Sequence, residues 1–141
     1  MGWEVDGVKY TWERPISTQQ TGFSMVCQSR DGLPDPVGGV TWYGLDDTMF
    51  TCYVPLYCGI TELPESYTTG SLDRFSWDSA WWVFNFVSNY AALRYQDMIV
   101  DVRATQAELE VMASDLLNGH ARHIDMREIK EENVYYYIGD F

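Results

Sequence analysis

The side chains best suited to bind a ligand lie in a short polar run, Ser17-Thr18-Gln19-Gln20-Thr21. These five hydroxyl and amide side chains lead directly into an apolar segment that begins after Gly22. Groups of this kind need hydrogen-bond partners when they are buried, and the partners can be backbone groups or a substrate. The residues alone favour the structural interpretation, with substrate binding as the alternative.

Paired carboxylates and paired histidines are further candidates for chemistry. Asp46 and Asp47 are adjacent and would suit a cation or a reacting group, but between two strands such a pair usually forms the turn itself. His120 and His123 have a spacing found in zinc sites, yet no cysteine or carboxylate pattern completes a ligand set. We therefore expect a turn, solvated histidines, and neither a metal ion nor a cofactor.

The three cysteines, Cys27, Cys52 and Cys58, have no metal-ligand spacing. Their odd number argues against a disulfide framework, so we expect small apolar residues in strands. The chain has no Gly-x-Ser-x-Gly motif and no glycine-rich phosphate loop.

Composition excludes two classes of partner. The chain carries 21 acidic against nine basic residues, a net charge of −12, which repels the phosphate backbone of a nucleic acid. Polar residues interrupt its densest apolar stretch, residues 80–93, so we expect no membrane span.

The aromatic content is unusually high, with six Trp, ten Tyr and six Phe among 141 residues. They predict a heavy core or a surface that another part of the protein normally covers.

The elements that position these residues follow from the hydrophobic pattern. Asp6-Gly7 between alternating residues predicts a hairpin, and Pro55 marks a bulge or an end in the last strand. A loop rich in turn-forming residues separates the first two strands of an antiparallel meander. The expected elements are a hairpin at 3–12, strands at 22–30, 40–45 and 48–57, and loops at 31–39 and 63–72. The first of the three strands is expected to be half-buried.

Two helices are expected to follow the strands. Residues 76–87 are apolar on almost every side, which predicts a buried helix with Ser76 as N-cap and Asp78 in its first turn. Residues 97–118 predict a surface helix closed by Gly119. Residues 122–141 fit either a short helix with a terminal strand or a loosely ordered tail. The whole chain is thus expected to be one α+β domain, an antiparallel sheet with two packed helices.

A longer pattern surrounds the polar run. It begins Glu13-Arg14-Pro15-Ile16-Ser17 and continues through Gln19-Gln20-Thr21-Gly22-Phe23-Ser24. Later segments of the same pattern are residues 28–30, 33–40, 42–47, 53–61, 64–66, 75–85, 94–95 and 98–99. In this order the pattern resembles the late ER-x-IS-x-QQT-x-FS segment of the bacterial cysteine-type dipeptidases, the dipeptidase A group. The C-terminal residues have no counterpart in it.

The resemblance implies a fold and a mechanism. Members of the group adopt the four-layer αββα sandwich of N-terminal-nucleophile hydrolases and hydrolyse dipeptides without a metal. Their nucleophile is an N-terminal cysteine whose own α-amino group acts as the base, and backbone or Asn donors hold the oxyanion. Gln19, Gln20 and Thr21 would lie nearest the substrate. Arg14 would bind a substrate carboxylate or form a surface ion pair.

The sequence departs from the group at the nucleophile. It begins Met1-Gly2-Trp3, and all three cysteines are internal, so none carries a free amino group. We therefore expect a C-terminal segment that is inactive alone, whose partners are the missing N-terminal half and, in the parent enzyme, a dipeptide. Apolar surface left uncovered would drive homo-oligomer formation.

Two alternatives from other classes stay open. One is a stand-alone acidic α+β module whose aromatic residues line a groove for a peptide or a sugar. Exposed tryptophans on a concave surface would favour it, and buried ones would weaken it. The other is a structural or regulatory paralogue that pairs with a catalytic subunit in trans.

Overall fold

The computed structural model describes residues 2–14 and 17–123, with side chains as far as Gly119. The fold is α+β with antiparallel pairing, as predicted. In chain order the elements are β1 (Gly2–Val5), β2 (Val8–Thr11), β3 (Phe23–Ser29), α1 (Asp35–Gly38), β4 (Gly39–Leu45), β5 (Val54–Tyr57), α2 (Glu65–Thr68), α3 (Ala80–Leu93) and α4 (Tyr95–His123). None of the helices in the described ranges is long and apolar enough to cross a membrane.

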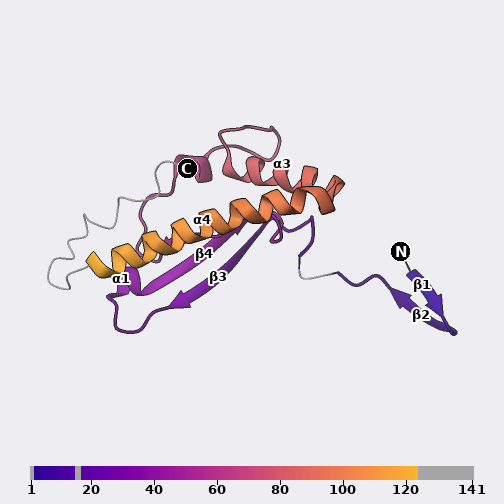
Figure 1. Ribbon diagram of the computed structural model, residues 1–141, viewed down its shortest axis with the longest axis horizontal. Helices are drawn as coiled ribbons and strands as arrows, with labels where there is room; N and C mark the ends of the chain where they lie inside the picture. The colour runs from indigo at the N-terminus through magenta and orange to yellow at the C-terminus, as the bar shows by residue number, and fades with distance from the viewer. Residues whose placement is uncertain (1, 15–16, 124–141) are drawn as a thin grey trace.

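The predicted N-terminal hairpin is confirmed. Strands β1 and β2 pair antiparallel, with Val5 opposite Val8. Asp6 and Gly7 both have positive φ, 51° and 77°, as a two-residue turn between twisted strands requires. The Trp3 and Tyr10 rings stack across the strands with centroids 6.0 Å apart. Figure 1 shows this hairpin projecting away from the rest of the chain, and all its described side chains are exposed.

The predicted meander is confirmed as a three-stranded sheet in the order β3-β4-β5, with β4 in the centre. Phe23 pairs with Leu45, and Val40 pairs with Tyr57. Strand β5 is shorter than predicted because residues 48–50 form a turn instead. Pro55 lies inside β5, which is tolerated because β5 is an edge strand of this sheet.

Several local predictions were wrong. The predicted loops contain one-turn helices, α1 and α2. Strand β3, expected to be half-buried, is almost wholly exposed, because it packs mainly against β4, whereas β5 at the other edge also contacts α4. Of the three cysteines expected in strands, Cys27 lies in β3, whereas Cys52 and Cys58 lie outside the strands. Cys52 is buried, and Cys27 and Cys58 are exposed.

Helix α3 begins at Ala80, and Ser79 rather than Ser76 occupies its N-cap position. The Ser76 hydroxyl instead accepts a hydrogen bond from the backbone N–H of Asp78, 3.2 Å away, which forms a turn ahead of the helix. The expectation that this helix is buried all round was wrong. Small side chains, Ser88 and Ala91, face the interior, and large ones such as Tyr90 and Leu93 face outward.

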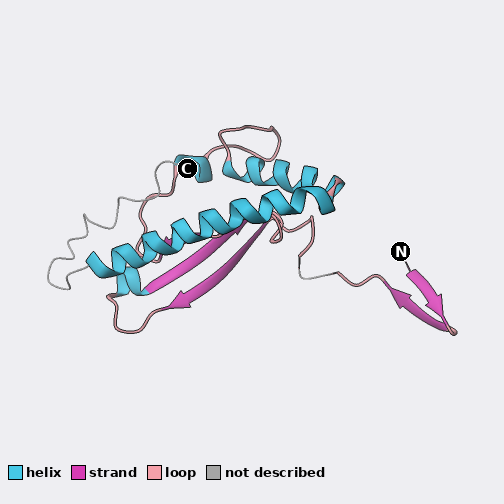
Figure 2. Cartoon of the chain, viewed as in Figure 1, coloured by secondary structure: helices cyan, strands magenta, loops and turns pink. Residues whose placement is uncertain are grey.

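Helix α4 is a surface helix, as predicted, but it runs through Gly119 to His123 instead of ending at Asn118. It buries Ile99, Ala113 and Leu117. Figure 2 shows α3 and α4 on the same side of the three-stranded sheet. Phe50, Ala91 and Ile99 form the buried cluster where the two helices and the turn after β4 meet, with Met98 and Val102 packed against it.

Candidate functional site

The candidate site lies where the central strand β4 ends. The next residue, Asp46, has φ +63°, and the chain turns at Asp46-Asp47 as the sequence predicted. Both side chains are buried, with 2% and 5% of their surface exposed. Left-handed backbone is unfavourable for most residues but accessible to Asp and Asn. This combination of a special backbone angle and buried charge sets the turn apart from an ordinary surface turn.

Asp46 joins the sheet to helix α3. Its backbone N–H donates to the carbonyl oxygen of Gly22 at 3.0 Å. Its Oδ1 accepts a hydrogen bond from Nδ2 of Asn85, also at 3.0 Å. Its Oδ2 is buried and has no hydrogen-bond partner among the described residues. One oxygen of this carboxylate is therefore satisfied by α3 and the other is not.

Asp47 organises the turn that follows. The Ser17 hydroxyl donates to Oδ1 of Asp47, and the backbone N–H of Met49 donates to the same oxygen at 3.0 Å. The Asp47 carbonyl accepts from the N–H groups of Phe50 and Thr51 at 3.0 and 3.1 Å. These bonds explain why residues 48–50 turn instead of extending β5 toward the N-terminus.

Helix α3 contacts the same place through a second side chain. Nε1 of Trp81 donates to the Gly22 carbonyl at 3.1 Å. Trp81 and Asn85 are four residues apart and so share one face of the helix. The Gly22 carbonyl thus accepts hydrogen bonds from both Asp46 and Trp81. We call this meeting point of Ser17, Gly22, Asp46, Asp47, Trp81 and Asn85 the acidic corner.

The structure places most of the predicted site residues beside the acidic corner. Thr18, Gln20 and Thr21 form a turn held by its own hydrogen bonds, including Thr21 N–H to the Thr18 carbonyl at 2.9 Å. The side chains of Gln19 and Gln20 are exposed, and Thr21 is half-buried. Arg14 is exposed on the linker that leads from the hairpin. The turn therefore lies next to the corner through Ser17 and Gly22.

Sequence reasoning missed Asn85 as a member of the site. A signal was present, because Asn85 is a polar residue within an otherwise apolar helical stretch. Its partner, Asp46, is 39 residues away along the chain, so no local spacing connects the two. The side chains of His120 and His123 lie outside the described part. Within that part, no group of three or more His, Cys, Asp or Glu side chains is placed to hold a metal ion.

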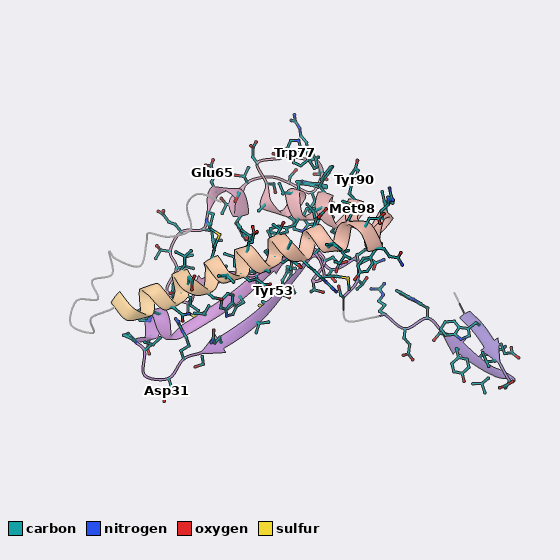
Figure 3. All side chains as sticks on the ribbon, in the orientation of Figure 1. Asp31, Tyr53, Glu65, Trp77, Tyr90 and Met98 are labelled. Atoms are coloured by element: carbon teal, nitrogen blue, oxygen red, sulfur yellow. The ribbon has the colours of Figure 1, made fainter. Side chains whose placement is uncertain are left out.

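Aromatic rings form a second surface feature along α3. Phe75 and Trp77 have centroids 4.7 Å apart, Trp77 and Phe86 4.9 Å, and Phe86 and Tyr90 4.3 Å. We call these four residues the aromatic strip. All four are exposed, Trp77 to 61%, and Figure 3 shows Trp77 and Tyr90 on the side of α3 away from the sheet.

Comparisons with known proteins identify the class. The model of Peptidase family C69 matches residues 4–108, which include most of the hairpin, the three-stranded sheet, α3 and the first half of α4. Those residues contain the whole acidic corner. The match covers more than half of the chain. The chain belongs to peptidase family C69.

Curated relatives are dipeptidases by name. The chain is 34% identical over 104 residues to "Probable dipeptidase B" of Lactococcus lactis subsp. lactis strain IL1403, covering 71% of this chain and 20% of the relative. It is 29% identical over 93 residues to "Probable dipeptidase" of Latilactobacillus sakei, covering 62% of this chain and 20% of that relative. The chain thus spans about a fifth of each relative. No solved structure gives a significant match. The resemblance to cysteine-type dipeptidases is confirmed.

The hydrogen bond from Asn85 to Asp46 gives the first test. Asn85→Ala would remove the donor to Oδ1 of Asp46, so that neither oxygen of this buried carboxylate would accept a hydrogen bond. We expect a loss of about 1–3 kcal/mol in the free energy of unfolding. Asn89→Ala is the matched control, because the Asn89 side chain is exposed on the next turn of α3 and donates only to the Asn85 carbonyl. Urea unfolding measures both, and equal losses would contradict the role given to Asn85.

Proposed function

We propose that this chain is the structural and substrate-side part of a dipeptidase that hydrolyses the peptide bond of dipeptides. The observation that carries the proposal is the C69 family match across residues 4–108, the same residues that build the acidic corner. The curated relatives that share this segment are named as dipeptidases and are about five times as long as the matched region. The remainder of such a polypeptide would supply the catalytic centre.

The nucleophile is proposed to lie outside residues 1–141. The mechanism implied by the family needs a thiol and a free amine on the same residue. Cys27, Cys52 and Cys58 are all internal to the chain and lack that amine. Burial also raises the pKa of the Cys52 thiol, and the Glu110 carboxylate adds to this, so its reactive thiolate is disfavoured. The chain alone is therefore proposed to be inactive.

The substrate is proposed to approach the corner from the turn that carries Gln19, Gln20 and Thr21. The exposed amides of Gln19 and Gln20 can donate to and accept from the backbone of a short peptide. Arg14 is a weaker candidate for the substrate carboxylate, because it is exposed on the linker and its guanidinium suits a two-point contact.

The uncovered apolar surface supports a larger assembly. One face of the hairpin presents Trp3, Val5, Val8, Tyr10 and Trp12, all exposed. Strand β3 exposes Phe23, Met25 and Val26, and the aromatic strip lies on α3 and the segment before it. An area of this kind on a chain of this size is typical of an interface. We propose that the rest of the dipeptidase covers it, and that a second copy does so when the chain is alone.

One observation favours a different function. Trp3, Trp12 and Trp77 are exposed, as a stand-alone module that binds a peptide or a sugar through aromatic residues would require. These residues lie on two separate elements, the hairpin segment and the segment before α3. Such a module would need no further polypeptide in order to act.

A chimera tests the dipeptidase proposal. The matching 104-residue segment of the Lactococcus lactis relative is replaced by the corresponding residues of this chain. We expect the purified chimera to hydrolyse alanyl-alanine, because the missing thiol and amine are restored. The relative with the segment deleted is the control and should be inactive. A folded chimera without hydrolysis, or hydrolysis by the 141-residue chain alone, would contradict the proposal.

Sedimentation tests the proposed self-association. At about 50 µM we expect the isolated chain to sediment at twice its 16.3 kDa mass or more. Salt at about 0.5 M should strengthen association, because it screens the repulsion between two chains of charge −12. Sedimentation as a monomer, or an assembly that dissociates at high salt, would contradict self-association through apolar contacts.

A further inference from the structure

The acidic corner holds two buried carboxylates, and in the part of the chain that the structure describes neither forms a salt bridge with a basic side chain. Asp46 and Asp47 are 2% and 5% exposed. The salt bridge found in the described residues joins Arg94 to Asp97 on the exposed surface, where α3 ends and α4 begins. Burial of a carboxylate costs several kcal/mol unless it is paired or fully hydrogen-bonded. Asp47 has two donors on one oxygen, whereas Asp46 has one donor in total on its carboxylate.

The turn geometry does not account for the charge on Asp46. A residue with φ +63° at this place must tolerate left-handed backbone, and Asn does so as well as Asp. Asn would also keep the oxygen that accepts from Asn85. What Asp46 adds is a negative charge and a second oxygen, Oδ2, which is buried and has no partner in the described part. A buried acceptor of this kind calls for a donor.

We propose that Asp46 Oδ2 receives the α-ammonium group of a dipeptide, so that the acidic corner is the subsite for the substrate's amino end. The inference rests on the proposed function for its substrate class. An ammonium group carries a positive charge and three N–H donors, the complement of a carboxylate oxygen without a partner. Asp47 places a second carboxylate at the next residue.

The polar turn provides the way in. Residues 17–22 are attached to the acidic corner at their two ends, where Ser17 donates to Asp47 and Gly22 accepts from Asp46. Between these ends, the hydrogen bonds of Thr18, Gln20 and Thr21 are internal to the turn. Because Oδ2 is buried, a peptide would reach it only after this turn moves aside. Gln19 and Gln20, both exposed on it, would then contact the peptide that enters.

Side-chain amide NMR on the isolated 141-residue chain tests the proposal. Alanyl-alanine carries the ammonium group, and N-acetyl-alanyl-alanine of the same length lacks it. We expect the Asn85 Nδ2 resonances to move in a saturable way with alanyl-alanine and not with the acetylated peptide. Equal shifts with both peptides, or no shift with either, would overturn the proposal.

Two variants separate charge from shape. Asp46→Asn retains the left-handed turn and an oxygen for Asn85 but removes the negative charge. We expect it to fold with a melting temperature at least as high as that of the unaltered chain, because a buried charge with one donor is removed. We also expect it to lose at least about tenfold in affinity for alanyl-alanine, because a charge-assisted hydrogen bond is lost. Asp73→Asn changes the charge equally at an exposed turn and should bind as the unaltered chain does. Unchanged affinity in Asp46→Asn would overturn the proposal.

Failure of this inference is distinct from failure of the proposed function. Suppose that the chimera hydrolyses alanyl-alanine but the Asn85 Nδ2 resonances do not move when the peptide is added. That result would refute the ammonium subsite and leave the dipeptidase assignment intact. If the Asn85 amide responds to the ammonium peptide but the chimera is inactive, the ammonium subsite stands and the dipeptidase assignment is refuted.

Discussion

A single buried carboxylate at the end of the central strand constrains this fold. Asp46 must find hydrogen-bond donors once the chain turns inward after β4, and Asn85 on α3 supplies one. That bond fixes the helix against the strand, and Trp81, one turn earlier, then reaches the Gly22 carbonyl that Asp46 also contacts. The polar segment before β3 contacts the same place through the hydrogen bond from Ser17 to Asp47. The position of the candidate site thus follows from satisfying the hydrogen bonds of one acidic side chain.

The packing around this corner is thin. Helix α3 faces inward with Ser88 and Ala91, which lets it approach closely but buries little apolar area. Several of its large residues, such as Phe86, Tyr90 and Leu93, face outward, as do those of β3 and the hairpin. An isolated two-stranded hairpin is marginally stable at best, and the described side chains of β1 and β2 have no cover. This distribution agrees with a chain that spans about a fifth of its dipeptidase relatives, where further layers would bury the outward faces.

Local signals predicted the elements well and their burial poorly. Asp6-Gly7 fixes the hairpin because few residue pairs accept two positive φ angles, and alternation gave the meander. Burial depends on neighbours that the pattern does not reveal, so the helix that is apolar on every side was wrongly placed in the core. Gly119 did not end α4. For the site, the run that includes Gln19 and Gln20 was found because it is contiguous. The Asn85–Asp46 pair was not, because it is formed across the fold.

Native-state hydrogen exchange at the Asp46 amide tests the central claim most directly. This N–H donates to the Gly22 carbonyl inside the acidic corner. If the corner is part of the cooperative core, the amide should exchange as slowly as the amides of the central strand β4, through global unfolding. Exchange at the rate of an unprotected loop would show that the turn opens independently of the sheet, and it would contradict the account.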